Sequence, residues 1–169
     1  MKPKAFTLLE TIIVLAIITI FFAISIPLFS RLTAGTKLST VARDVASVLR
    51  TARGYAISNN TEYYVKFNNV VTPNRYHIYY KHEGSDIAVD KIYKLPTGIW
   101  FYRPDYALDG NDEAIEFTAD TGDTACFKPT GELEETGLNT SVYVADDVTT
   151  SAKSKKITVE KTTGRVKID

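Results

Sequence analysis

An uncharged, strongly apolar run near the start of the chain constrains its fold most. The run extends from Thr11 to Phe29, with Lys2 and Lys4 before it and Arg31 after it. A helix of this length spans about 28 Å, close to the roughly 30 Å hydrocarbon core of a bilayer. The run exceeds the apolar core of a secretory signal peptide, and no Ala-x-Ala-like site follows it. We therefore predict a retained single-pass membrane helix, in preference to a conventional cleaved signal peptide.

One acidic residue, Glu10, stands at the N-terminal edge of this run. A carboxylate well inside a bilayer costs on the order of 3 kcal/mol, so an acid in such a segment indicates a function. The alternative is that Glu10 lies at the membrane edge and extends its carboxylate to water. A plain membrane anchor would not need this residue.

The residues around Glu10 resemble a known processing signal. Residues 4–11 read KAFTLLET, which is similar to the cleavage and methylation signal of type IV prepilins. The resemblance implies a leader over residues 1–5, cleavage between Ala5 and Phe6 by a prepilin peptidase, and N-methylation of Phe6. Ala5 stands where that family most often has glycine, and both residues are small.

Glu10 has a physical role in that setting. Cleavage creates a positive amine at the start of a helix, where the first N–H groups add partial positive charge. An amine buried among packed helices is costly unless an opposite charge compensates it. We expect Glu10 of one subunit to pair with the amine of a neighbour and so to set the axial register of a filament.

A single long helix is expected from residue 6 to residue 57. Residues 6–29 form the membrane or filament-core part, where Pro27 predicts a kink or a locally melted turn. Over residues 30–57 the helix becomes amphipathic, with one apolar stripe at three- and four-residue spacing. The stripe consists of Leu38, Val41, Ala42, Val45, Val48, Leu49, Ala52 and Ala56.

The rest of the chain, residues 58–169, has the pattern of a β-rich head. Short segments rich in Val, Ile, Tyr and Phe alternate with turn-forming residues. The expected strands are 62–67, 75–81, 98–102, 114–118, 125–128, 141–145, 155–160 and 164–168. The apolar stripe must be buried against them, so we predict an α+β fold, with a long helix packed on an antiparallel β-sheet or β-sandwich.

Three segments of this part resemble the GspH/FimT family of minor pseudopilins and minor pilins. They are the helix end 48–57, the Phe-x-Pro-x-Gly segment 127–131 and the closing Gly-Arg strand 163–168. The resemblance implies a minor subunit of a type II secretion pseudopilus or a type IV pilus, single-pass in the bacterial inner membrane with its head in the periplasm. Its partners would be major and minor (pseudo)pilins, the prepilin peptidase/methyltransferase and the inner-membrane assembly platform.

No catalytic residue, cofactor or metal site is predicted. His77 and His82 are five residues apart in or beside a strand, on opposite faces. Cys126 lies in an apolar strand, which favours a buried, inert thiol. The acidic segment 108–113 resembles a solvated loop more than a calcium site, although its oxygens suit calcium. We therefore expect a protein that is not an enzyme.

A basic C-terminal stretch leaves one alternative function open. Some minor pilins of this family bind DNA for uptake through a terminal Gly-Arg-x-Arg, and the corresponding residues here are Gly164-Arg165-Val166-Lys167. Arg165 and Lys167 would share one strand face and could follow a phosphate backbone. The alternative interpretation, which we favour, is an edge strand kept soluble by its lysines.

Overall fold

The computed structural model describes residues 8–106, 114–119, 123–134 and 140–169. Within residues 24–34 it describes the helical backbone but not the side chains. The chain divides into two compact units, Met1–Lys37 and Leu38–Asp169, which are taken separately below. The segment 108–113, where the sequence places an acidic loop, lies outside the described residues.

The first helix, α1, extends from Leu8 to Asn59. The helical assignment continues through Pro27, whose side chain is not described, so the kink there stays a prediction. Asn60, at φ 50°, takes the left-handed conformation that commonly ends a helix. In the described part of the chain, no helix combines the length and the apolarity needed to cross a membrane. The membrane segment predicted over 6–29 extends beyond the described side chains and stays a prediction.

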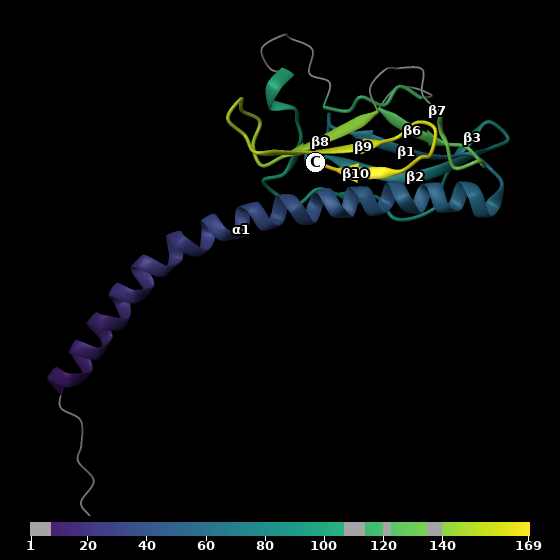
Figure 1. Cartoon of the computed structure of the whole chain (residues 1–169). Coiled ribbons are helices and arrows are strands. Elements are labelled where there is room, and N and C mark those ends of the chain that lie inside the picture. The colour runs from purple at the N-terminus through teal and green to yellow at the C-terminus, as the bar shows by residue number, and fades with distance from the viewer. Residues whose placement is uncertain (1–7, 107–113, 120–122, 135–139) are drawn as a thin grey trace, which may run out of the picture. The chain divides into compact units, whose positions relative to one another are not determined.

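The predicted apolar stripe of α1 is confirmed in the second unit. All eight of its residues, from Leu38 to Ala56, are buried, whereas Arg43, Asp44 and Arg50 are exposed. The stripe packs on the strands that follow it, and Figure 1 shows this part of α1 lying along one side of them. The helix therefore closes the core of the head.

Two antiparallel sheets make up the rest of the second unit (Figure 1). The first has the order β3-β2-β1-β6-β7, and β4 also pairs with β2. Its strands are β1 (Tyr63–Asn68), β2 (Arg75–His82), β3 (Ser85–Ala88), β4 (Tyr93–Lys94), β6 (Thr124–Phe127) and β7 (Leu133–Glu134). The second has the order β10-β9-β8-β5. Its strands are β5 (Trp100–Phe101), β8 (Ser141–Ala145), β9 (Ser154–Val159) and β10 (Val166–Ile168), and a 3-10 turn, η1 (Pro104–Tyr106), follows β5.

Alternation along the strands decides which side chains enter the core. Tyr76 and Ile78 of β2 point to the helix side and are buried, and Phe67 of β1 stacks on Tyr76. Val142, Val144, Ile157 and Val159 enter the same cluster from the second sheet. The predicted α+β class, a long helix on antiparallel sheet, is confirmed.

The strand predicted over 114–118 is wrong. This segment forms only isolated bridges, Ile115 with Val142 and Thr118 with Thr124, and no ladder. Its apolar alternation reflects burial, because Ile115 and Phe117 are both in the core. The sequence reading also missed β3, β4 and β7.

Candidate functional site

The first candidate site is the apolar surface of α1 in the first unit. Between Leu8 and Phe22 every large apolar side chain is exposed, with 43% to 81% of its surface accessible. They are Leu8, Leu9, Ile12, Ile13, Val14, Leu15, Ile17, Ile18, Ile20, Phe21 and Phe22. A helix that is apolar all round is normally buried in lipid or among other helices. This surface is therefore suited to burial against other apolar elements.

Glu10 is the acidic residue of this surface. It lies in the first turn of α1 and its side chain is exposed. Ala5 and Phe6, the predicted cleavage site, lie outside the described residues. The geometry of a carboxylate–amine pair between subunits is thus a prediction that the single chain does not test.

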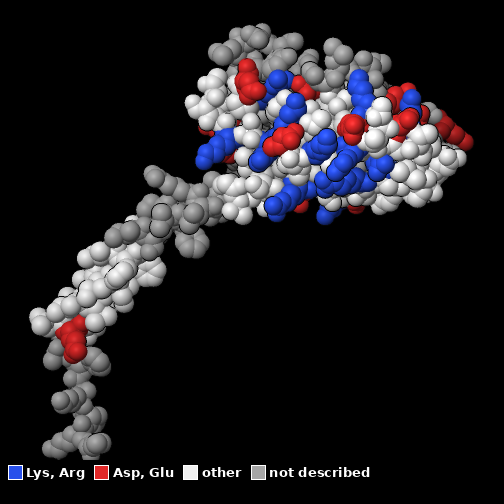
Figure 2. Space-filling view, in the orientation of Figure 1, with Lys and Arg blue, Asp and Glu red and all other residues white. Residues whose placement is uncertain are grey.

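The second candidate site is the C-terminal strand β10, which forms one edge of the second sheet. Arg165 and Lys167 are exposed, while Val166 between them is buried and pairs with Val159. The two cations therefore point to the same side, as predicted. Figure 2 shows blue side chains gathered over the region of β9 and β10, with acidic side chains among them.

The outer edge of β10 is covered by the helix. The carbonyl of Arg165 accepts a hydrogen bond from the backbone N–H of Glu160, the residue after β9, at 2.9 Å, so its neighbour Val166 turns its own carbonyl away from the sheet. That carbonyl accepts a hydrogen bond from Arg50 Nη2 of α1 at 3.2 Å. An edge strand with an open backbone group is a template for unwanted pairing, and Arg50 blocks that group here.

The three short segments that resemble GspH/FimT sequences meet at one point. Arg53 of α1 donates from Nε to the carbonyl of Gly131 at 3.0 Å. Gly131 and Gly164 have φ values of 84° and 61°, which side chains disfavour. A Cβ on Gly164 would lie 2.0 Å from the Gly131 oxygen and 2.8 Å from Arg53 Nε. These glycines are required for the helix, the 127–131 turn and the last strand to pack together.

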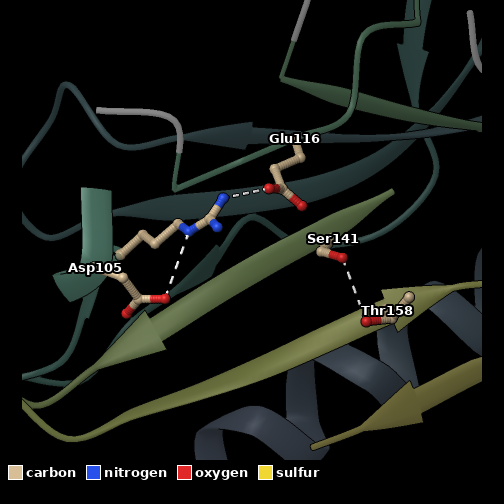
Figure 3. Close-up of polar contacts among 5 residues, drawn as sticks. Asp105, Glu116, Ser141 and Thr158 are labelled. Carbon is tan, nitrogen blue, oxygen red and sulfur yellow. Dashed lines mark hydrogen bonds and ion pairs between the residues drawn. The ribbon is translucent and has the colours of Figure 1, made fainter. Parts of the chain in front are cut away.

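A buried ion pair lies against Tyr143 of β8, in the second sheet. Arg103 Nη1 lies 2.5 Å from Glu116 Oε1, and only 17% and 3% of the two side chains are exposed. Asp105 approaches the same guanidinium from η1 at 3.9 Å, which Figure 3 shows together with the bond between Ser141 and Thr158. The Arg103 guanidinium also stacks over the Tyr143 ring, 4.7 Å from its centroid. The sequence analysis did not predict this cluster, which holds Arg103 and Glu116 against β8.

The thiol of Cys126 has the surroundings that the sequence predicts. It is fully buried, and burial raises its pKa to about 12. Its Sγ, with a carboxylate oxygen each from Glu62 and Glu134, forms a group of ligand-type atoms within 4.8 Å of one another. Both carboxylates have other partners, since Tyr64 donates to Glu62 at 2.7 Å and Lys128 lies 3.4 Å from Glu134. The thiol thus stays protonated and inert at neutral pH.

The two histidines do not converge on a common site. His77 is half-buried on the outer face of β2, whereas His82 is exposed at the tip of the β2–β3 hairpin. Burial lowers the pKa of His77, and the nearby Lys66 charge lowers it further while Asp86 acts in the opposite sense. His77 is therefore neutral at pH 7.

Comparison with known proteins identifies the chain. A prokaryotic N-terminal methylation motif matches residues 1–26. No curated protein matches. The crystal structure of the type IV minor pilin FimU of Pseudomonas aeruginosa is similar, with a TM-score of 0.51 at 14% identity over 81% of this chain and 91% of that one. The minor pseudopilin EpsH of the type 2 secretion system of Vibrio cholerae gives 0.48 at 11% identity, over 79% and 96%. The family model of the type II transport protein GspH matches residues 41–163, well over half of the chain, so this protein belongs to the GspH family of pilin-like minor subunits.

Proposed function

We propose that this chain is a structural subunit of a short periplasmic filament, without enzymatic activity. The observation that carries the proposal is the continuous exposed apolar surface of α1 from Leu8 to Phe22, which lies within the methylation motif matched over residues 1–26. Exposed to water, an apolar surface of this size promotes aggregation, whereas its burial stabilises the assembled state by about 25 cal/mol per Å² of apolar area. Before assembly, residues 6–29 anchor the chain in the bacterial inner membrane, and the head lies in the periplasm. The same helix then packs at the filament axis.

Processing supplies the charge that this assembly uses. A prepilin peptidase cleaves between Ala5 and Phe6, methylates the new amine, and leaves Glu10 four residues from it. The carboxylate then pairs with the amine of an adjacent major or minor subunit while the assembly platform adds subunits. The type II secretion pseudopilus is the system we favour, because the matching family model is that of a type II transport protein.

Processing is tested by co-expressing the full chain with a prepilin peptidase and measuring the mass of the product. We expect loss of residues 1–5 and addition of one methyl group. The variant Ala5→Leu should block cleavage, because a bulky residue replaces the small one before the bond. An unprocessed wild-type chain that still assembles would refute the proposal.

Assembly is tested by complementing a secretion strain that lacks this subunit. Glu10→Gln should reduce secretion and the recovery of this subunit with neighbouring subunits by about tenfold, because it leaves a buried amine uncompensated. Glu83→Gln, which removes an exposed carboxylate of the head, is the matched control and should behave as wild type. If the Glu10→Gln variant assembled as well as the wild type, Glu10 would not set the axial register.

DNA binding at β10 is the competing function, and one observation favours it. Arg165 and Lys167 are exposed on one side of the strand, as a phosphate-tracking surface requires. Against it, Glu160 and Asp169 directly follow β9 and β10, and lysine lacks the planar fork of the second arginine in Gly-Arg-x-Arg. A gel-shift titration of the full chain in detergent distinguishes the two functions. Salt-sensitive binding lost in the double variant Arg165→Ala/Lys167→Ala, but kept in Lys91→Ala, would favour DNA uptake.

A further inference from the structure

The outer face of the first sheet carries a group of cations close to its β4 edge. Arg75 of β2 stands directly opposite Lys94 of β4 in the antiparallel register. Lys66 of β1 stands opposite His77, two residues along β2 from Arg75. Because Tyr76 and Ile78 point into the core, Arg75 and His77 point to the opposite, outer side. We call Lys66, Arg75, His77 and Lys94 the Arg75 surface.

This arrangement is unfavourable for the isolated head. Like charges directly opposite each other on paired strands destabilise a sheet. Among the described residues, neither Arg75 nor Lys94 forms an ion pair. The Nε atom of Arg75 is in addition buried without a hydrogen-bond partner in the described part of the chain. A buried donor that has lost water and gained no acceptor destabilises the folded state.

The field at this surface also acts on its histidine. The charge of Lys66 adds to burial in lowering the pKa of His77, although Asp86 opposes it. His77 is therefore a neutral neighbour of the cations rather than a fourth positive charge. Its half-buried ring gives the surface a flat wall beside the cations, with Tyr79 5.7 Å away.

The neighbouring loop indicates what kind of molecule fits. Val70, at the tip of the turn between β1 and β2, has 89% of its surface exposed. Asn68 holds this turn by accepting hydrogen bonds from the backbone N–H groups of Val70 and Val71, at 3.1 and 3.3 Å. An exposed apolar side chain in the turn that leads into Arg75 suits a polypeptide that carries both acidic and aliphatic side chains. Single-stranded nucleic acids bind chiefly by stacking their bases on exposed aromatic faces, whereas here the His77 ring is half-buried and Tyr79 is buried.

We infer that the Arg75 surface is a docking site for an acidic segment of a partner protein, whose carboxylates neutralise Arg75 and Lys94. The guanidinium of Arg75 has the fork geometry for a bidentate carboxylate, and the ammonium of Lys94 supplies a second charge. The interaction goes beyond filament assembly through α1, because it uses a different unit of the chain. It gives the head a means of selecting a protein partner by charge.

The test uses the full chain in detergent and a fluorescent peptide of alternating glutamate and valine. A peptide with glutamine in place of glutamate is the ligand control. We expect binding of the acidic peptide alone, weakening as salt rises, with a loss of about tenfold in Arg75→Gln and in Lys94→Gln. Lys153→Gln, which removes an exposed lysine next to the second sheet, should bind as wild type.

Thermal unfolding separates docking from a structural role. Lys94→Gln removes a like-charge contact, so its melting temperature should equal or exceed that of the wild type while its binding falls. Lost binding accompanied by a lowered melting temperature in both variants would overturn the inference. So would equal binding of the two peptides, no binding of either, or binding of a single-stranded oligonucleotide at this surface in place of the acidic peptide.

Discussion

Substitution of Gly164 by alanine should be among the most damaging single changes in the head. Its φ of 61° costs a residue with a side chain about 1–2 kcal/mol. The new Cβ would also lie 2.0 Å from the Gly131 oxygen, far inside contact distance, so the 127–131 turn must move. That movement breaks the 3.0 Å bond from Arg53 Nε, and a hydrogen bond to a charged group is worth about 1.5–3 kcal/mol.

The two contributions together give a destabilisation of about 2.5–5 kcal/mol. For a head of this size, 1 kcal/mol corresponds to about 4 °C, so the melting temperature should fall by roughly 15 °C. Thermal unfolding of the full chain in detergent, followed by the fluorescence of Trp100, measures this change.

Two other glycines provide matched controls. Gly98 has φ 83° but no atom within 4 Å of an added Cβ, so Gly98→Ala should cost only the backbone part, about 1–2 kcal/mol. Gly54 lies within α1 with open space around its added Cβ, so Gly54→Ala should stabilise by about 0.5–1 kcal/mol. If Gly164→Ala and Gly98→Ala melted within about 2 °C of each other, the close packing at Gly164 would be refuted.

Three further changes have expected outcomes. Asn74→Ala should destabilise the head by about 2–4 kcal/mol in chemical denaturation, because its buried amide donates to two carbonyls at 2.9 and 3.0 Å and accepts from the Phe101 N–H at 2.8 Å. Arg103→Ala should cost about 3–5 kcal/mol in the same assay by leaving Glu116 charged and buried, and Arg103→Ala/Glu116→Gln should recover part of it. The Cys126 thiol, with its pKa raised by burial to about 12, should react with a thiol reagent at pH 8 about a thousandfold more slowly in the folded chain than in denaturant; equal rates would contradict its burial.

The helix was predictable because apolar residues recur at three- and four-residue spacing, a pattern that only a helix places on one face. Every residue of the stripe from Leu38 to Ala56 is buried as expected, since α1 has only one apolar side in that part. The strands were harder to predict, because alternating apolar residues indicate that side chains are buried but do not indicate that the backbone pairs in a sheet. Ile115 and Phe117 alternate and are buried, yet their segment makes only bridges. The short strand β3 was missed because it has only four residues, all exposed, and Ile87 and Ala88 are adjacent and do not alternate with polar residues.

The polar contacts of the head had weaker sequence signals. Arg103 and Glu116 are thirteen residues apart, and nothing in their local spacing indicates a buried pair. Asn74 resembles any turn residue after a proline, and its contact with Phe101 depends on how the two sheets pack. By contrast, Gly131 and Gly164 were visible as parts of short motifs. What the sequence did not show is that both glycines contact the same arginine, Arg53.

That contact changes what the terminal Gly-Arg motif signifies. Gly164 is required by packing against Gly131 and Arg53, whether or not the chain binds any ligand. Arg50 likewise serves the fold, because it covers the open carbonyl of Val166. The motif by itself is therefore a signature of head closure and not of DNA binding. DNA binding through this motif must therefore depend on the side chains of Arg165 and Lys167, so their removal should weaken that binding without lowering the melting temperature. If the double variant unfolded as readily as Gly164→Ala, these two side chains would belong to the closure as well.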